Sequence, residues 1–299
     1  MGKGHVALMR GDDRYTNVAQ ALQAIADDVE LAGKQRIVIK PNFVTTHDAT
    51  AATHREAVRA VLDFLWARGI RGVTLAEGPA MGTLEQGLRN YGYQELIDKY
   101  GLRIVDLNSD EGVPVDLWDR DLRPLRLMAA RTLVESDLRI SVGPPKAHDY
   151  AIVTLSLKNM AVGALLRGQK SRIHQSYPVI NLNLYRMARY VAPHLAVIDG
   201  FLAMEGDGPV GGDPVDWRIA IASADFVAAD ALAATLMGFP PEGIGYLHYC
   251  RLKGLGESDL QQMRLEGNVA PAQVQRRFRP HRSYKQQVKW QIPDVDRYL

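Results

Sequence analysis

The sequence predicts an α/β protein built on a mostly parallel sheet with helices on both faces, a Rossmann-like three-layer sandwich. Two observations predict this class. Short apolar runs rich in β-branched residues alternate along the chain with segments of helical periodicity. No internal repeat or low-complexity linker separates them. The 299 residues are 46% hydrophobic and 23% charged, which is ordinary for a globular protein with a sizeable core.

The alternation places the elements as follows. Strands are expected at His5–Met9, Arg36–Lys40, Gly72–Ala76, Arg103–Leu107, Leu138–Val142, Ala196–Ile198 and Arg218–Ala222. Helices are expected at Val18–Glu30, His54–Arg68, Leu84–Asn90, Tyr93–Tyr100, Ala129–Ser136, Asn181–Val191 and Phe226–Met237. In a sheet of this kind, ligands bind beyond the carboxyl ends of the strands, so we looked for functional residues there.

The helix at His54–Arg68 shows how each element is justified. Its apolar residues recur at steps of three and four and form one face: Val58, Val61, Leu62 and Leu65. Thr53 followed by Glu56 predicts a capping box at the start of the helix, and Gly69 predicts its end.

The single cysteine, Cys250, excludes a disulfide framework and an iron–sulfur cluster held by this chain, because each needs several cysteines. It is expected inside a core helix, and the chain suits a reducing compartment. No apolar run approaches the roughly 18 residues that span a bilayer. The first residues show no signal peptide. We therefore expect a cytoplasmic protein with no membrane partner.

The net charge of +2 hides a basic tail, because residues 270–299 contain seven Lys or Arg and two Asp or Glu. We expect one α/β domain at 1–269, which carries the site, and a basic C-terminal tail at 270–299. Basic residues interleaved with aromatic ones suit an RNA strand. Pro280 and Pro293 and the lack of a known motif favour a solvated or subunit-packing arm instead. Nucleic acid is thus not the expected partner, and a homodimer is left open.

The first candidate segment leaves the second strand at Lys40-Pro41-Asn42. Pro41 ends strand pairing, so Lys40 and Asn42 emerge where a ligand binds. Arg55, at the start of the next helix, adds a cation beside free backbone N–H groups that attract anions. An ordinary turn and helix cap explains Thr53 and Glu56 but neither Lys40 nor Asn42, so we weigh the two interpretations evenly.

The second candidate segment is the most informative. A strand ends at a Pro-Pro pair followed by Lys146 and His148, and Lys158-Asn159 then stands in an apolar stretch, with His174 further on. A buried lysine is costly unless it has a partner, and desolvation lowers its pKa, which makes it a better base or nucleophile. Each residue alone has a structural explanation, but the cluster favours a catalytic site formed by His148, Lys158 and His174.

Two glycine-rich segments complete the candidates. Glu77–Thr83 follows a strand but matches no nucleotide motif, so a glycine turn is favoured. Asp199–Gly212 is expected to wrap around a ligand through Gly206 and Gly208. Oxygen ligands of a divalent metal are a further interpretation, with Glu205 and Asp207 as candidates alongside His174, although their spacing matches no defined metal loop. Asp225 is expected to cap the next helix.

Several segments in one order resemble the signature blocks of domain of unknown function (DUF) family 362. They are Lys40-Pro41-Asn42, Pro144–His148, Leu157–Met160, Asp199–Pro209 and Ser223–Asp230. The resemblance covers roughly Arg36 to Gly256. Members of this family are often joined to ferredoxin-type iron–sulfur modules, which implies redox-linked metabolism, but the one cysteine of this chain cannot ligate such a cluster.

A weaker similarity links the chain to the nickel-pincer lactate racemase family. His148, Lys158 and His174 follow one another at steps of 10 and 16 residues, as a His, a Lys and a His do there. The resemblance implies an acid/base role for His148, covalent attachment of the pincer nucleotide to Lys158, and nickel ligation by His174. The chain departs from that family in two places. Thr154–Leu157 replaces a glycine-rich stretch, and Glu77-Gly78-Pro79 stands where the second catalytic histidine is expected.

Together these features favour an enzyme that performs acid/base chemistry on a small anionic substrate bearing a carboxylate or a phosphate, with redox or metal involvement left open. His148, Lys158 and His174 are the predicted catalytic residues. The predicted substrate-binding residues are Lys40, Asn42, Arg55, Lys146, Asn159, Gly206 and Gly208. The alternatives are an isomerase or racemase that uses a nickel-pincer nucleotide, and a non-catalytic binder of nucleotides or RNA. The cofactor is open between a divalent metal, a nickel-pincer nucleotide and none.

Overall fold

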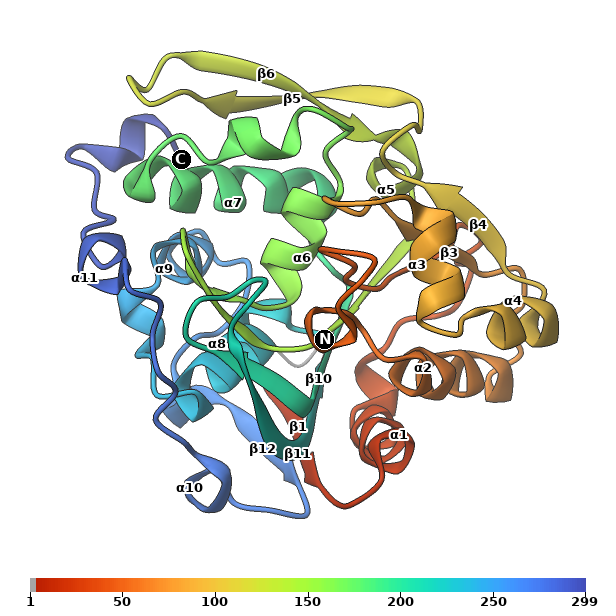
Figure 1. Ribbon diagram of the computed structural model, residues 1–299. Helices are drawn as coiled ribbons and strands as arrows, with labels where there is room; N and C mark the ends of the chain where they lie inside the picture. The colour runs from red at the N-terminus through yellow and green to blue at the C-terminus, as the bar shows by residue number, and fades with distance from the viewer. Residues whose placement is uncertain (1–3) are drawn as a thin grey trace.

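The computed structural model describes residues 4–299, and within them ten strands form one sheet (Figure 1). Eight strands lie side by side in the order β12-β1-β11-β10-β7-β2-β3-β4. Only β11 runs antiparallel to its neighbours in this series. In chain order they are β1 (His5–Arg10), β2 (Ile37–Lys40), β3 (Thr74–Glu77), β4 (Arg103–Asp106), β7 (Leu138–Gly143), β10 (Leu195–Glu205), β11 (Asp213–Ser223) and β12 (Arg264–Gly267).

Helices cover both faces of this sheet, which confirms the predicted three-layer α/β fold. Side chains alternate between two cores along each strand, because successive residues of a strand point to opposite faces. Ile37 and Ile39 of β2 enter one core and Val38 enters the other. The first core is covered by α1 (Arg14–Ala24), α2 (Arg55–Ala67), α3 (Leu84–Asn90) and α4 (Gln94–Tyr100). The second is covered by α5 (Arg131–Val134), α6 (Ser156–Gly163), α7 (Tyr177–Val191), α8 (Phe226–Leu236) and α9 (Gly245–Leu252), which contains the buried Cys250.

Some expected elements differ from those observed. The helix expected at Ala129–Ser136 is wrong at its start, because Ala129 and Ala130 end strand β6 (Pro124–Ala130), which pairs with β5 (Gly112–Trp118). Alternate residues of β6 are buried and exposed, which is a strand pattern, and only Arg131–Val134 is helical. The helix expected from Val18 begins at Arg14 instead, since the Asp13 side chain caps it. The hairpins β5–β6 and β8–β9, the strand β12 and the helix α6 were not predicted, whereas the core helix expected around Cys250 is α9.

The element that carries two of the predicted site residues is the short helix α6. Its N-terminal backbone N–H groups are capped by a residue from α8: Asp230 accepts hydrogen bonds from the N–H groups of Ser156 (2.8 Å) and Leu157 (3.1 Å) and from the Ser156 hydroxyl. Leu155, at the N-cap position itself, provides no side-chain cap. A contact 74 residues away therefore fixes where α6 starts and which way Lys158 points.

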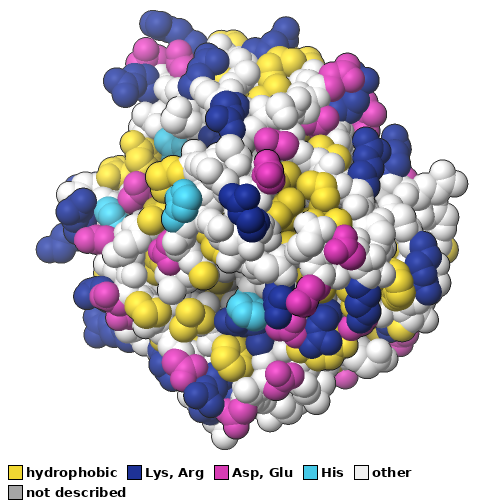
Figure 2. Space-filling model, turned by 45° about the vertical axis from the view of Figure 1, so that its right-hand side comes forward, with side chains coloured by type: hydrophobic (Ala, Val, Ile, Leu, Met, Phe, Trp, Pro, Cys, Tyr) yellow, Lys and Arg dark blue, Asp and Glu magenta, His cyan; other side chains and the backbone are white. Residues whose placement is uncertain are grey.

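The C-terminal tail is packed on the domain rather than solvated along its length. In Figure 1 it runs past α10 (Pro271–Val274) and α11 (Tyr284–Gln287) along one side of the molecule. Val274, Phe278 and Trp290 are buried in the same core as α7–α9. Figure 2 shows basic and acidic side chains interspersed on the face in view rather than gathered. No helix within residues 4–299 is long and apolar enough to cross a membrane.

We predict that Asp230→Ala lowers the free energy of unfolding by about 2 kcal/mol, because it leaves buried N–H groups at the start of α6 without acceptors. Burial raises the pKa of Asp230 to about 7, above its ordinary 3.8, although the hydrogen bonds from Ser156 and Leu157 oppose this. Stability contributed by a group with a raised pKa is lost as the pH rises through the folded value, so the cost should be larger at pH 5 than at pH 8. Urea unfolding at both pH values measures it.

Thr235→Ala, on the same helix, is the matched control and should change the unfolding midpoint little, because Thr235 only bonds to a carbonyl of its own helix. Equal effects of the two substitutions would contradict the capping role of Asp230.

Candidate functional site

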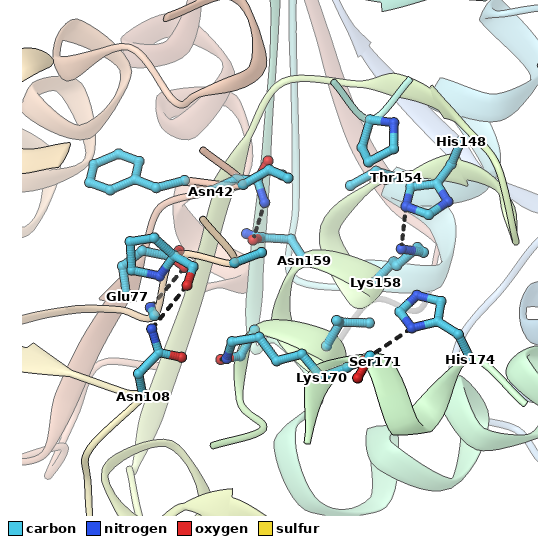
Figure 3. Close-up of a pocket in the computed structure, with 18 of the residues that line it drawn as sticks. Asn42, Glu77, Asn108, His148, Thr154, Lys158, Asn159, Lys170, Ser171 and His174 are labelled. Carbon is cyan, nitrogen blue, oxygen red and sulfur yellow. Dashed lines mark hydrogen bonds between the residues drawn. The ribbon is translucent and has the colours of Figure 1, made fainter. Parts of the chain in front are cut away.

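A pocket of about 650 Å³ opens at the carboxyl ends of β2 and β3. Its other walls come from the hairpin of β8 (Lys146–His148) and β9 (Ile152–Thr154), from α6, and from the short helical turn Lys170–Ile173. All three predicted catalytic residues line it (Figure 3). Of the predicted substrate-binding residues, Lys40, Asn42 and Asn159 line it as well. Residues from distant parts of the sequence thus meet where the fold predicts a ligand site.

The centre of the pocket holds a chain of three side chains, Asp149–His148–Lys158. The Lys158 Nζ lies 2.8 Å from His148 Nε2, and Asp149 Oδ1 lies 2.8 Å from His148 Nδ1. The Tyr150 N–H donates toward the same Nδ1 at 3.0 Å, so in the neutral ring this nitrogen bonds either to Tyr150 or to Asp149. While Lys158 is an ammonium it donates to Nε2, and the ring hydrogen then lies on Nδ1, because the bond to the charged carboxylate is stronger than the one from the neutral N–H. His148 is therefore oriented to accept a hydrogen bond from the charged Lys158.

Burial favours the neutral forms of Lys158 and His148. Desolvation lowers the pKa of Lys158 to about 8, although the charge of Asp149 opposes the shift. Desolvation and the charge of Lys158 lower the pKa of His148 to about 3, so its imidazole is neutral at physiological pH. Partial burial raises the pKa of Asp149, but the hydrogen bond with His148 and the charge of Lys158 outweigh it and hold the pKa at about 2. A lysine with a pKa near 8 has an appreciable unprotonated fraction near neutral pH.

His174 lies beside this chain with one nitrogen free. Its ring is parallel to that of His148, with centroids 6.3 Å apart, and Tyr150 packs edge-on against it. Its Nδ1 lies 3.0 Å from the carbonyl oxygen of Lys170, which can only accept, so Nδ1 carries the hydrogen and Nε2 keeps its lone pair. Burial lowers the pKa of His174 to about 4. The neutral ring can therefore act as an acceptor or a ligand.

The floor of the pocket is a buried network around Lys40. Lys40 Nζ donates to Glu77 Oε2 (2.6 Å), to Asn159 Oδ1 (2.9 Å) and to the carbonyl of Pro41. Asn42 Nδ2 donates to the same Asn159 oxygen at 3.0 Å. Desolvation lowers the pKa of Lys40 while Glu77 opposes the shift. This network ties the ends of β2 and β3 to helix α6.

Lys146 is fully buried beneath the pocket and does not line it. Its Nζ donates to Asn42 Oδ1 (2.5 Å) and to the carbonyl of Ala51 (2.7 Å), and it contacts no carboxylate among the described residues. Burial and the charge of Lys158 lower the pKa of Lys146 to about 7. It therefore acts on the pocket through Asn42, whose side chain it orients.

Other predicted residues lie outside the pocket. Arg55 pairs with Glu95 of α4 at 3.1 Å and donates to the carbonyl of Gly92, so its side chain points to α4 rather than into the pocket. The helix cap there is His54 rather than Thr53, whose hydroxyl instead bonds to Val142. Gly206 and Gly208 lie in the β10–β11 turn, and a Cβ on Gly208 would overlap the carbonyl of Ala147, so this glycine allows close packing of two backbones. From this turn Pro209 reaches the pocket.

The metal candidates do not come together in the part of the chain that is described. Glu205 accepts a hydrogen bond from the backbone N–H of Arg279, and Asp207 lies 3.5 Å from His281, so both face the tail. Within residues 4–299, no three His, Cys, Asp or Glu side chains form a group suited to holding a metal ion.

One tail residue that no sequence pattern singled out supports His148 directly. Gln287 is 1% exposed, and its amide bridges the β8–β9 hairpin by donating to the carbonyl of His148 (2.8 Å) and accepting from the N–H of Ile152. Ile152 has a φ of +65°, which is costly for a β-branched residue and needs support from its surroundings. Asn108 and Lys170 were also missed, because only the fold brings them to this pocket, and Asp149 was missed although it directly follows His148.

With this geometry established, comparisons place the chain among known proteins. The family model described as "Domain of unknown function (DUF362)" matches residues 37–235, so the chain belongs to this family. The Thylakoid-associated protein sll1697 from Synechocystis sp. is 26% identical over 216 residues, which cover 70% of this chain and 65% of that protein. The chain therefore matches less than two thirds of the length of that relative.

A solved structure shows the same fold. The lactate racemase apoprotein from Thermoanaerobacterium thermosaccharolyticum superposes with a TM-score of 0.51 at 14% identity, covering 77% of this chain and 56% of that one. At this identity the likeness extends to the fold alone. The sequence resemblance to the lactate racemase family is thus matched at the level of the fold.

We predict that Glu77→Gln lowers the free energy of unfolding by about 3–5 kcal/mol, because it leaves the Lys40 charge buried without its partner. Denaturant unfolding at pH 7 measures the loss. The double variant Lys40→Met with Glu77→Leu removes both charges and should recover most of it. If the double variant is as unstable as Glu77→Gln, the loss does not come from an unpaired buried charge on Lys40.

We predict that Gln287→Leu lowers the free energy of unfolding by about 2–4 kcal/mol, since it leaves two buried backbone groups of the His148 hairpin without partners. The exposed neighbour Gln286 provides the control, and Gln286→Leu should leave stability nearly unchanged. Unfolding curves of the two variants, with hydrogen exchange at Ile152, test this. A protected Ile152 amide in Gln287→Leu would contradict the proposed support.

Proposed function

We propose that this DUF362 protein is an enzyme that binds a small anionic substrate in the pocket and performs acid/base chemistry on it. Lys158 supplies the reactive amine, His148 accepts a hydrogen bond from it, and Asp149 holds the His148 ring. The observation that carries the proposal is the 2.8 Å contact between Lys158 Nζ and a neutral, carboxylate-oriented His148 inside a pocket.

The charges around the pocket support an anionic substrate. Four lysines, Lys40, Lys146, Lys158 and Lys170, lie buried or half-buried around it, whereas only Glu77 and Asp149 approach them as carboxylates within the pocket wall. Glu77 pairs with Lys40, and Asp149 pairs with His148. The remaining positive charge lies in a low-dielectric environment, where attraction for a carboxylate or phosphate is strong.

The residues support a simple path to the reactive amine. Near pH 8 part of Lys158 has lost its proton to solvent, and His148 Nε2 accepts a hydrogen bond from an N–H of the remaining amine, which orients the amine lone pair in the pocket. The neutral Lys158 amine then attacks a carbonyl carbon of the substrate or removes a proton next to it. Asn42, whose oxygen accepts from Lys146, keeps one amide N–H that can orient the substrate, whereas the amide of Asn159 is used by Lys40, Asn42 and Ser141.

A second candidate function is an isomerase that uses a nickel-pincer nucleotide, favoured by the free Nε2 of His174 beside Lys158. The residues fit part of that group. Lys158 provides an amine for attachment, and His174 provides a nitrogen ligand whose Nδ1–H is held by a backbone carbonyl. The pocket is large enough to hold a nucleotide of this kind. When bound, such a group accepts a hydride from a 2-hydroxy acid. Glu77, at the position of a second base, is neutralised by Lys40, so His148 would act as a single base.

We predict that an amine-selective acylating reagent modifies Lys158 at a rate that rises with a midpoint near pH 8 rather than near 10.5. The neutral amine reacts, and its fraction grows as the pH passes its pKa. Asp149→Asn removes a charge that raises the pKa of Lys158, so the midpoint should move to lower pH. Peptide mass spectrometry over pH 6–11 measures the profile.

The function itself is tested by incubating the protein in heavy water with a panel of 2-oxo and 2-hydroxy acids and their phosphorylated analogues. NMR measures whether a carbon-bound hydrogen of each acid exchanges for deuterium. Lys158→Ala and His148→Ala should abolish the exchange while the fold is retained. Arg55→Ala, outside the pocket, serves as the control. Full exchange in either pocket variant, or a Lys158 midpoint near 10.5, would refute the proposed roles.

A further inference from the structure

Part of the pocket wall lies away from the proposed reactive groups and contains polar groups that are not paired within the described chain. Figure 3 shows Asn108 beside Glu77, across the pocket from His148, Lys158 and His174, with Lys170 between the two sides. Asn108 is 7% exposed, and its Nδ2 donates to the carbonyl of Pro79 at 2.9 Å. Its Oδ1 has no hydrogen-bond partner among residues 4–299. A buried acceptor without a donor is costly, so a ligand donor is expected there.

Two cations flank Asn108. The backbone N–H of Arg167 donates to the Asn108 carbonyl at 3.1 Å, which places the two residues together, and Arg167 lines the pocket mouth. Its guanidinium is exposed and pairs with no carboxylate in the described chain. Lys170 Nζ donates to the carbonyls of Gly163 and Leu165 and likewise has no carboxylate partner there.

The nearby carboxylates do not cancel these cations. Glu77 already accepts from Lys40 and from the N–H of Gly78. Asp106 accepts from the N–H of Asn108 at 2.9 Å. Counting these groups together with Lys40, Lys170 and Arg167 leaves one positive charge in excess at this wall. The unpaired guanidinium is the group best suited to an anionic oxygen pair.

The size of the pocket leaves room for a ligand longer than a three-carbon acid. Its volume of about 650 Å³ lies in the range of sites that enclose ligands of many atoms. A carbonyl group placed at Lys158 would therefore leave the Asn108 wall for another part of the same molecule.

We propose that Arg167, Lys170 and Asn108 form a second subsite, which binds a terminal phosphate or carboxylate of the substrate, with a hydroxyl or amide of the same molecule donating to Asn108 Oδ1. The substrate is thus bifunctional, with an electrophilic carbonyl at Lys158 and an anionic group at Arg167. This inference rests on the proposed function for the reactive end, whereas the subsite itself stands on Asn108, Arg167 and Lys170.

The first test uses aldehyde pairs that differ only in the anionic group. Pyridoxal 5′-phosphate is compared with pyridoxal, and 4-carboxybenzaldehyde with benzaldehyde. The Lys158 amine attacks the aldehyde carbon and water leaves, and borohydride then delivers a hydride to the imine, which fixes the adduct for mass spectrometry. We expect one charged aldehyde to label Lys158 about tenfold faster than its neutral partner. Which pair shows the preference distinguishes phosphate from carboxylate.

The matched variants are Arg167→Ala and Arg172→Ala. Arg172 belongs to the same segment and is exposed, but it does not line the pocket. The preference for the charged aldehyde should fall to about threefold or less in Arg167→Ala and remain in Arg172→Ala. A preference that survives in Arg167→Ala, or equal labelling of Lys158 by both members of each pair, overturns the subsite.

A second test needs no reaction at Lys158. Inorganic phosphate and acetate are titrated into the wild type and both variants while NMR follows the side-chain amide of Asn108. Saturable shifts that depend on Arg167 but not on Arg172 support the subsite, even if no aldehyde labels Lys158, in which case only the proposed reactive amine fails. Absence of binding in the wild type, or equal binding in Arg167→Ala, overturns the subsite.

Discussion

The pocket depends on the buried ion pair between Lys40 and Glu77. Lys40 leaves β2 and Glu77 ends β3, so the 2.6 Å contact joins the carboxyl ends of adjacent strands. The same ammonium reaches Asn159 on α6, which places that helix, and with it Lys158, over the sheet edge. A Cβ on Gly163 would lie 2.0 Å from Lys40 Cε, so only glycine leaves the lysine room. By neutralising Glu77, the pair also leaves the charges of the other pocket lysines uncompensated.

The supports of the reactive chain come from remote parts of the sequence. Asp230 of α8 caps α6, and Gln287 of the tail bridges the hairpin that carries His148. Lys158 and His148 are thereby held from opposite sides by two buried polar residues. Their contact is fixed before a substrate arrives, and such preorganisation makes a proton transfer efficient.

Local patterns in the sequence predicted the frame and much of the pocket. Strand and helix periodicity gave the three-layer fold, and polar residues after strand ends, Lys40 and Asn42, line the site because parallel strands bring their carboxyl ends to one edge. His148, Lys158 and His174, which were selected as one cluster, also line one pocket. Arg55 had an equally suitable position at a helix start, but its conformation is decided by Glu95 on α4, a contact that no local pattern reveals.

What could not be predicted depends on long-range contacts. Helix α6 is short, and its cap lies on another helix, so no start signal precedes Ser156. Basic composition suggested a solvated or subunit-packing arm, but the apolar residues Phe278 and Trp290 and the amide of Gln287 bind the tail to the domain. Asn108 follows β4 without any motif, and its unpaired Oδ1 becomes visible only in three dimensions.

The central claim is that His148 is a neutral base held by Asp149 and coupled to Lys158. Nitrogen-15 NMR of the His148 ring tests it most directly. We expect Nδ1 to carry the hydrogen while Lys158 is charged, the ring to stay neutral as the pH falls to 5, and its shifts to change near pH 8 as Lys158 loses its proton. A ring that becomes protonated near pH 6.5, or that shows no response near pH 8, would show that His148 is not a neutral partner of Lys158.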